Sequence, residues 1–471
     1  MARPARLGRP ALACEPVPPA IVAALGELGE ALGQWSRSHR AASLDEHEQQ
    51  VLGLLRRVAA PLLGAVLAEA LGLGEASQER LRSACPGCGT RRRRQSWRPR
   101  EVATVCGAVR LRRPYYYCRP CRRGWCPGDA ILGLAPSQEL SARLRAWLVL
   151  LGVLEPPRRA VKVLEELTGL AVGAETLRTH TRVVGDTLLA AQERAAARVE
   201  ATQEPAEAVD AAAGLLVAQA DGLLLRYLDG WHEVKLGLLA GCRVGEPHAL
   251  LAPSYVAARL GAEAFGPRWL AEAARRGALE VLGWEPPPAG TPAALALPSL
   301  ARLRHALILG DGAPRIWALA AEHFGQRTEV IDWYHATEHL WALGKALWGE
   351  DTPETRRWVE RAKALLRDEG AAALLATWRT LRPATAPAAE VLRRERGYFA
   401  TNAGRMRYPQ YRARGLPVGS GAVESGAKHV VQQRMKRAGM RWSFGGAQAL
   451  LALCAYHASG RPLPDLLRRA A

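Results

Sequence analysis

The second half of the chain repeats a pattern that constrains its fold: a short apolar run leads into an aspartate that has glycine beside it. Leu215 to Ala220 leads into Asp221, and Ala306 to Leu309 leads, through one glycine, into Asp311. Apolar runs of this length, bounded by turn residues, are typical of buried strands. A carboxylate just past such a strand stands at the rim of a sheet, where it is held rigidly and still reaches solvent.

The segments around these runs alternate between strand and helix. Further strands are predicted over Leu223 to Leu228, Glu233 to Leu239 and Glu329 to Asp332, and helices over Pro314 to His323 and His335 to Leu347. Strands followed by helices, with acids at the strand ends, predict an α/β core.

Two acids on neighbouring strands can share divalent cations, because carboxylate oxygens are hard ligands. The alternative is that each Asp-Gly pair makes a simple turn, as we expect of Asp229-Gly230 between two strands. A third acid favours the metal interpretation: Glu424 follows the glycine-containing loop Pro417 to Gly421, near the start of a helix predicted over Ala422 to Gln433. A glutamate at a helix start can also be an ordinary residue that the helix dipole favours.

Basic residues follow Glu424, which suits an acid that holds a metal next to a phosphodiester. We expect DNA contacts from Lys428, Arg434, Lys436, Arg437 and Arg441. The whole chain has 64 Lys and Arg against 45 Asp and Glu, a net charge of +19, which favours a polyanionic partner such as nucleic acid. The heavy use of Arg also matches the coding bias of a GC-rich genome. That bias alone does not explain why basic residues outnumber acidic ones.

Around the acids, the sequence resembles a known family. Gly419 to Ser425 and Gln433 to Ser443 resemble the C-terminal signature of the ISKra-type insertion-sequence transposases, which belong to the DDE group related to Mutator-like elements. Asp221 to Gly237 resembles the family's segment around its first catalytic aspartate, and Gly310 to Trp317 the segment around its second. Asp332 to His335, with Glu338 and His339, resembles the Asp-x-x-His element of that group. The resemblance covers roughly Cys85 to the C-terminus.

The resemblance implies a retroviral-integrase-like RNase H fold that holds two Mg²⁺ (or Mn²⁺) ions. Asp221 would bridge the two ions, and Asp311 and Glu424 would complete their ligands. His335 would contact the scissile phosphate or donate a proton to the leaving group. The alternative for His335 is an imidazole that packs at a helix start or binds Asp332.

The implied function is that of a DNA transposase, which cleaves DNA at the ends of an insertion sequence and transfers the strands. Its partners would be the terminal repeats and the target DNA, on which it would act as a homo-oligomer. Two other functions share these features: a non-catalytic DNA-binding regulator on a degenerate nuclease core, and a metal-dependent nuclease. The presence of all three acids favours an enzyme.

Cysteines form the second strong motif, since six of the nine lie between Cys85 and Cys126. Two Cys-x-x-Cys turns offer four thiolates suited to tetrahedral Zn²⁺: Cys85, Cys88, Cys118 and Cys121. We expect a short β-ribbon here, with Cys106 and Cys126 as buried or free thiols. Its many arginines and aromatics suit phosphate neutralisation and base stacking, although a solvated basic face is the alternative.

Between the ribbon and the α/β core, the chain has the outline of a helix-turn-helix. A helix over Arg158 to Leu167, a turn at Thr168-Gly169 and a helix over Gly173 to Leu188 carry Arg178 and Arg182. Ordinary helical packing is the alternative to DNA binding.

The predicted units are a helical region (1–83), the zinc ribbon (84–130), the helix-turn-helix-like segment (131–205), the first part of the core (206–350), a helical insertion (351–415) and the C-terminal part of the core (416–471). We see no run of about twenty apolar residues, so we expect no membrane-spanning helix. The start of the chain also lacks the apolar stretch of a signal peptide, and we expect a cytoplasmic, nucleoid-associated protein.

Overall fold

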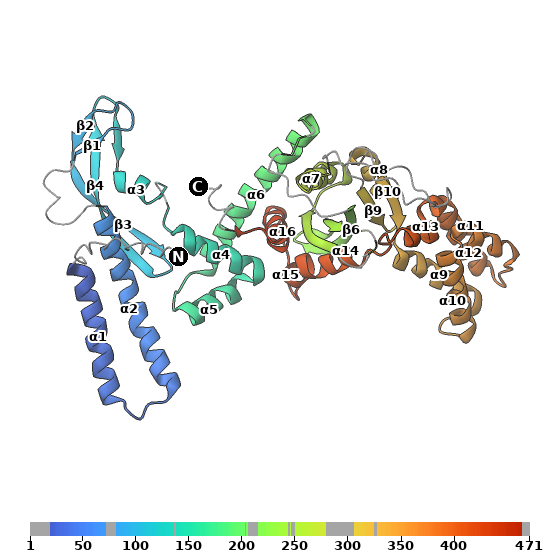
Figure 1. Ribbon diagram of the computed structural model, residues 1–471, viewed down its shortest axis with the longest axis horizontal. Helices are drawn as coiled ribbons and strands as arrows, with labels where there is room; N and C mark the ends of the chain where they lie inside the picture. The colour runs from blue at the N-terminus through green and yellow to red at the C-terminus, as the bar shows by residue number, and fades with distance from the viewer. Residues whose placement is uncertain are drawn as a thin grey trace, which may run out of the picture.

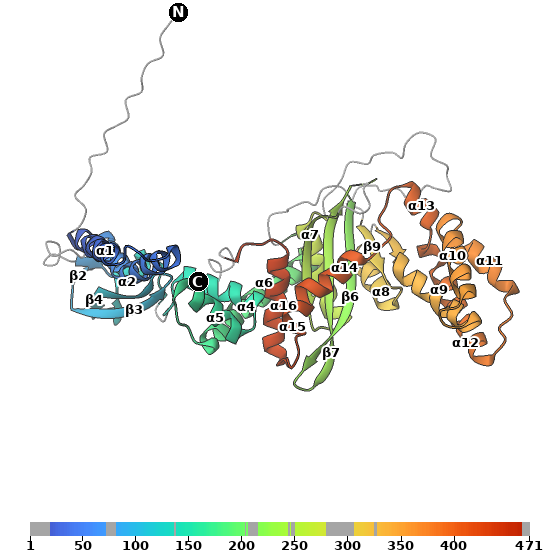
Figure 2. The ribbon, with the colours of Figure 1, turned by 90° about the horizontal axis from the view of Figure 1, so that it is seen from below.

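The computed structural model describes residues 19–71, 82–135, 138–202, 204–205, 215–243, 245, 250–278, 306–324 and 327–463. In this part of the chain the fold is mixed α/β (Figures 1 and 2). The body is elongated, with N-terminal helices and small sheets at one end, a large sheet in the middle and a helical group at the other end (Figure 1). The Pro-rich segment from Glu285 to Pro298 lies outside the described residues.

The central sheet has five strands in the order β10-β9-β6-β7-β8. They are β6 (Leu215–Tyr227), β7 (Gly230–Cys242), β8 (Leu250–Ala258), β9 (Ala306–Gly310) and β10 (Arg327–Ile331). β6, β7 and β8 form an antiparallel meander, whereas β9 and β10 run parallel to β6. Parallel strands need a crossover, and α8 (Pro314–His323) supplies it between β9 and β10.

The structure corrects one prediction about the first acid. Leu215 to Ala220 and Leu223 to Leu228 were predicted as separate strands, but they belong to one long strand, β6, with Asp221 in its middle. The reason is that β7 pairs with β6 along its whole length, from Leu215 opposite Cys242 to Tyr227 opposite Gly230.

Helices cover both faces of the sheet. On one face, α7 (Ala262–Arg275), α8 and α9 (Trp333–Trp348) pack against buried residues of β6 and β9. On the other face lie α6 (Ala174–Thr202), α14 (Gly421–Gly426) and α16 (Phe444–Ala458). Between α14 and α16 the chain forms a π-helical turn over Ala427–Gln432 and the short helix α15 (Gln433–Met435), where one continuous α-helix was predicted.

The predicted insertion is helical in the structure. It contains α10 (Pro353–Asp368), α11 (Ala371–Thr377), α12 (Ala386–Asn402) and α13 (Tyr408–Ala413), at the end of the molecule away from the ribbon (Figure 1). Trp378 and Phe399 are fully buried here and belong to the same apolar cluster as the sheet residues under α9. These helices therefore share one continuous apolar core with the central sheet.

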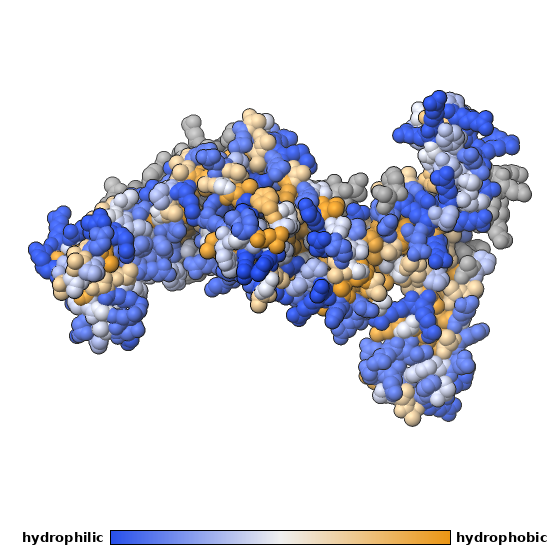
Figure 3. Space-filling view, turned by 180° about the vertical axis from the view of Figure 1, so that it is seen from behind, coloured by the Kyte–Doolittle hydropathy of each residue, from blue (hydrophilic) through white to orange (hydrophobic). Residues whose placement is uncertain are grey.

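The N-terminal end combines a helical hairpin with small sheets. The hairpin is α1 (Pro19–Ser38) and α2 (Leu44–Ala70); the sheets contain β1 (Arg82–Ala84), β2 (Arg91–Arg93), β3 (Ser96–Thr104), β4 (Gly107–Cys118) and β5 (Arg123–Trp125), followed by α3 (Pro127–Ile131). Among the described helices, α2 alone is long and apolar enough to cross a membrane by length and composition, which is weak evidence because core helices pass the same test. Figure 3 shows hydrophobic and hydrophilic residues mixed over this hairpin.

The helix-turn-helix prediction needs a correction in length. The first helices are α4 (Ala142–Leu154) and α5 (Pro157–Thr168), and a left-handed Gly169 ends α5 as predicted. The third helix, α6, extends well past the predicted Leu188 to Thr202. Its second half buries Val199 against Leu270 of α7, because a helix of this length passes beyond α4 and α5 and reaches the core. α6 is therefore partly a scaffold helix.

Candidate active site

Asp221 and Asp311 lie near each other on the central sheet, at the end of the pairing between β6 and β9. The parallel pairing of β6 with β9 ends where Gln219 lies opposite Leu309. Asp221 follows Gln219 by two residues, and Asp311 follows Leu309 by two residues, just past the end of β9. The acids therefore mark the point at which the two strands separate, and both line one small cavity together with Glu233 and Arg315.

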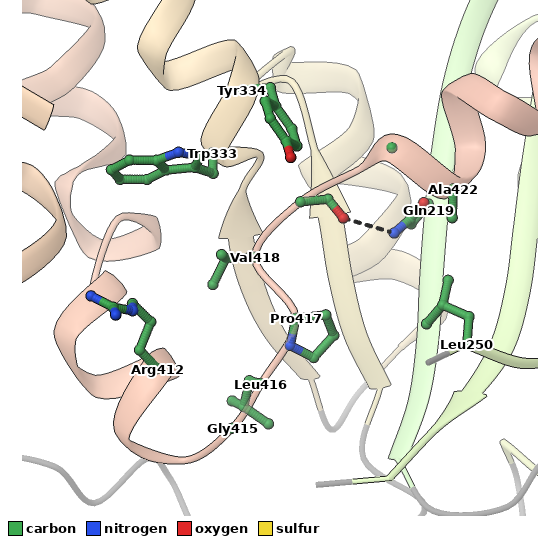
Figure 4. Close-up of a pocket in the computed structure, with 12 residues that line it drawn as sticks. Gln219, Leu250, Trp333, Tyr334, Arg412, Gly415, Leu416, Pro417, Val418 and Ala422 are labelled. Atoms are coloured by element: carbon green, nitrogen blue, oxygen red, sulfur yellow. Dashed lines mark hydrogen bonds between the residues drawn. The ribbon is translucent and has the colours of Figure 1, made fainter. Parts of the chain in front are cut away.

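Glu424 reaches this part of the sheet through α14, which is tied to β6 by Gln219. The side chain of Gln219 accepts from the backbone N–H of Val423 (3.0 Å) and donates to the carbonyl oxygen of Gly419 (3.5 Å; Figure 4). Alternate residues of a strand share a face, so Asp221 faces the same side of the sheet as Gln219. Glu424 itself accepts a hydrogen bond from the Ser420 hydroxyl (3.2 Å). No sequence motif pointed to Gln219 as a residue of the site.

The charges at this part of the sheet act on one another. Burial raises the pKa of Asp221, and the negative charges of Asp311, Glu424 and Glu233 raise it further, against a lowering hydrogen bond from the N–H of Gly222. Among the described residues, no three of these carboxylates offer oxygens that all lie within 4.8 Å of one another. In this metal-free arrangement the structure therefore brings the acids near one another without closing them into a metal-ligand cluster.

This repulsion predicts that Asp221→Asn makes the metal-free protein more stable. Because the pKa of Asp221 is raised in the folded state, the folded protein binds more protons than the unfolded chain above the ordinary aspartate pKa, and stability falls as the pH rises through that window. In thermal unfolding with a chelator, the variant should melt higher than the wild type near pH 7, and the difference should vanish near pH 4. A lower melting temperature at neutral pH would contradict the repulsion.

Sequence reasoning missed a charged group beside Asp221. Glu233 of β7 forms ion pairs with Lys235 (2.9 Å) and with Arg315 of α8 (2.7 Å). A Cβ atom at Gly222 would lie 2.2 Å from the Glu233 carboxylate, so a larger residue here would displace this side chain. Arg315, whose side chain is 51% exposed, is thus held next to Asp221 and Asp311, where it can meet phosphate oxygens, whereas Lys235 is buried. Glu233 and Lys235 were seen in the sequence only as part of the first-Asp segment.

Asp332 is a structural residue rather than a metal ligand. It is 2% exposed, and its two oxygens accept the backbone N–H groups of His335 (2.8 Å) and Ser420 (2.6 Å). Both oxygens are therefore used by the backbone, and the carboxylate joins the start of α9 to the loop that leads to Glu424. His335 contacts Asp332 through its backbone, not through the imidazole that was considered as the alternative.

We predict that Asp332→Ala destabilises the protein by roughly 3 kcal/mol, since it leaves two buried N–H groups without an acceptor. Asp332→Asn keeps one acceptor oxygen and should lose about half as much. Denaturant unfolding monitored by tryptophan fluorescence measures both. Equal stability of the alanine variant and the wild type would show that these two hydrogen bonds do not contribute to the free energy of unfolding.

His335 lies in the first turn of α9 with its side chain 34% exposed. Its Nδ1 atom is 3.3 Å from the Glu338 carboxylate, and its Nε2 atom is 3.3 Å from Nε2 of His339.

The segment that leads to α14 also borders a pocket whose lining includes Trp333, Tyr334 and Arg412 (Figure 4).

The predicted DNA-binding residues divide into three groups. Lys428, Lys436 and Arg441 are exposed. Arg178, Arg182 and Arg437 are engaged with acids, namely Glu175, Asp186 and Glu155. Arg434 corrects the prediction: it is 6% exposed and donates twice to the Gly152 carbonyl oxygen, so it anchors the C-terminal segment to α4 and is not available to DNA.

The four cysteines of the two Cys-x-x-Cys turns come together at one end of the ribbon. Their sulfur atoms all lie within 4.8 Å of one another, a spacing at which they could hold one metal ion, and Zn²⁺ fits four thiolates. Cys85 and Cys118 are buried, and the Thr90 hydroxyl and backbone lower the pKa of Cys88 to about 6. Cys106 and Cys126 are outside this cluster and are free thiols in the structure, as predicted.

No protein-family model matches the chain, and no curated protein matches it.

Proposed function

We propose that this protein is a DNA transposase with an RNase H-like core, which uses divalent metal ions to cleave DNA at the ends of an element and to transfer the strands. The observation that carries the proposal is the placement of Asp221 near Asp311 and Glu424, which come from distant segments of the chain and whose negative charges add to burial in raising the pKa of Asp221. A cluster of this kind at a sheet edge suits metal-assisted phosphoryl transfer.

The order of the strands supports the RNase H-like core. A three-stranded antiparallel meander is extended by two strands parallel to β6, and the first acid stands on β6 itself. The helices α10 to α13 lie in the chain between the second acid and Glu424, as expected for an insertion before the catalytic glutamate.

Asp221, Asp311 and Glu424 would hold two Mg²⁺ or Mn²⁺ ions. When bound, these ions would activate a water molecule or a DNA 3′-OH and stabilise the leaving oxygen in an in-line displacement at phosphorus. Arg315, held by Glu233, would neutralise the phosphate next to the scissile bond.

The charge distribution supports DNA as the substrate. Besides the net charge of +19, the exposed Lys428, Lys436 and Arg441 follow Glu424 along the chain. On the ribbon, Arg98 lies 3.6 Å over the ring of Tyr115, and Arg94 and Arg112 flank Trp97. Zinc at the four cysteines would hold this ribbon for DNA contact. A homo-oligomer on terminal repeats and target DNA, close to the nucleoid, follows from the same proposal.

The test is a strand-transfer assay with the DNA that flanks the gene and Mg²⁺ or Mn²⁺. A transposase should cleave at the element ends and join them to target DNA. Cleavage without joining, and without preference for those ends, would indicate the nuclease instead. Binding to DNA without any cleavage would indicate the non-catalytic regulator.

A further inference from the structure

Four side chains from two helices form a line of contacts close to the Asp311 loop. The Glu395 carboxylate of α12 lies 2.5 Å from Nδ1 of His339, and Nε2 of His339 faces Nε2 of His335 at 3.3 Å. On the outer side, Nδ1 of His335 lies 3.3 Å from Glu338. The line runs from a buried carboxylate, 1% exposed, to one that is 74% exposed.

Glu395 is ionised in this arrangement. Burial alone would raise the pKa of Glu395, but hydrogen bonds from His339 and Arg394 outweigh burial and hold its pKa below the ordinary value. Arg394 donates to one carboxylate oxygen at 2.9 and 2.7 Å. An ionised carboxylate can only accept, so the proton in the contact with His339 belongs to Nδ1 of His339.

The positions of the protons then constrain the two imidazoles. With Nδ1–H of His339 facing Glu395 and Nδ1–H of His335 facing Glu338, both Nε2 atoms of neutral rings would present lone pairs to each other at 3.3 Å. That contact becomes a hydrogen bond when one additional proton lies between the two atoms. The pair is therefore arranged to share one proton beyond two neutral rings.

Tyr398 joins this pair to the loop of the second acid. Its ring stacks on His339 with the centroids 3.7 Å apart, and its hydroxyl donates to the Asp311 carbonyl oxygen at 3.0 Å. Gly312 has φ of 98°, and a Cβ atom there would lie 2.9 Å from the Tyr398 ring. One helix of the insertion, α12, thus positions both the His339 ring and the loop of a candidate metal ligand.

We infer that His339 and Glu395 are positioning residues that enable His335 to donate a proton to the 3′-oxygen that leaves phosphorus. This inference rests on the proposed function. Exposed Glu338 must first move off Nδ1 of His335 when DNA binds. As the phosphorus–oxygen bond breaks, the leaving oxygen takes the proton from Nδ1 of His335, and the proton on Nε2 of His339 passes to Nε2 of His335.

The step is balanced. Both rings end neutral, His339 keeps its Nδ1–H on Glu395, and the proton of the attacking hydroxyl is released to solvent. The charged groups that face the pair are Glu338 on α9, Glu395 and Arg394 on α12, and the Asp311 and Asp332 carboxylates, whose charges reach Tyr398. Glu395 is the buried acid among those in direct contact, so its negative charge is screened least.

The test compares two substitutions on one helix. Glu395→Gln replaces the acid that binds His339, whereas Glu390→Gln removes an exposed acid of α12 that pairs with Arg393 through both carboxylate oxygens. His339→Gln is the second variant of the relay. Single-turnover cleavage should slow about 100-fold for Glu395→Gln and His339→Gln, and should stay within about two-fold of the wild type for Glu390→Gln.

A substrate with a bridging 3′-sulfur distinguishes a proton relay from a structural role. Sulfur leaves without protonation, so Glu395→Gln and His339→Gln should cleave this substrate as fast as the wild type does, with Mn²⁺ in all reactions. Equal defects on the oxygen and sulfur substrates would overturn the relay.

A readout without catalysis separates the relay from the proposed function. In ¹⁵N spectra of imidazole-labelled full-length protein, with the His335 signal assigned through His335→Gln, Glu395→Gln should make His335 titrate at lower pH, and Glu390→Gln should not. An unchanged His335 titration would overturn the relay even in an active enzyme. If the wild-type protein never cleaves DNA, the proposed transposase function is wrong. The titration would still show whether Glu395 acts on His335 through His339.

Discussion

Asp221→Ala is expected to abolish DNA cleavage and strand transfer, with a loss of at least about 1,000-fold in rate. Asp221 is the acid whose ionisation is opposed by burial and by the other two carboxylates, so it stands at the centre of the cluster. Without it, the site would lose one of the three carboxylates that would hold the metal ions. Glu424→Ala should give a loss of the same order, because Glu424 belongs to the same cluster.

The matched control is Asp229→Ala. Asp229 also precedes a glycine, but it lies in the exposed turn between β6 and β7, where it contacts His232 and Arg259. This variant should keep its activity, and all three variants should bind DNA as the wild type does in a fluorescence anisotropy titration. Full strand transfer by both Asp221→Ala and Glu424→Ala would refute the proposed mechanism.

Removal of zinc is expected to unfold the cysteine-bearing end of the ribbon formed by β1 to β5. β1 and β2 have three residues each, and the buried apolar residues of the ribbon core, Val102, Val109 and Leu111, lie in β3 and β4. The end that carries the cysteines therefore depends on metal–sulfur bonds, and structural zinc sites of this kind contribute on the order of 10 kcal/mol. Cys118→Ser should remove zinc and expose this segment to protease.

The measurements are zinc content and limited proteolysis, after treatment with a zinc-selective chelator and in the Cys118→Ser variant. Cys106→Ser is the control, because Cys106 lies in the turn between β3 and β4 and outside the four-sulfur cluster. If Cys118→Ser retained one zinc per chain and a protease-resistant ribbon, the four-thiolate site would be incorrect. DNA affinity should fall together with zinc if the ribbon binds DNA.

The correct and incorrect predictions have physical reasons. The cysteine cluster was predicted from spacing, because two Cys-x-x-Cys turns are a common way to supply four thiolates to one metal ion; one turn lies between β1 and β2 and the other between β4 and β5. The exposure of Arg434 could not be predicted in this way. An arginine in a basic segment looks like a DNA contact until packing places it under α4, where the Gly152 carbonyl oxygen accepts its protons.

The sequence by itself determined the local parts of this protein: the strands and helices, the cysteine turns, and the three acids as candidates. Such features depend on residues close together in the chain, and periodicity and turn chemistry describe them. Only the tertiary structure decided that Gln219 ties Glu424 to the strand of Asp221, that Arg315 shares Glu233 with Lys235, and that Glu395 lies behind His339. These contacts join positions far apart in the chain, and they depend on strand register and helix packing, which no local pattern records.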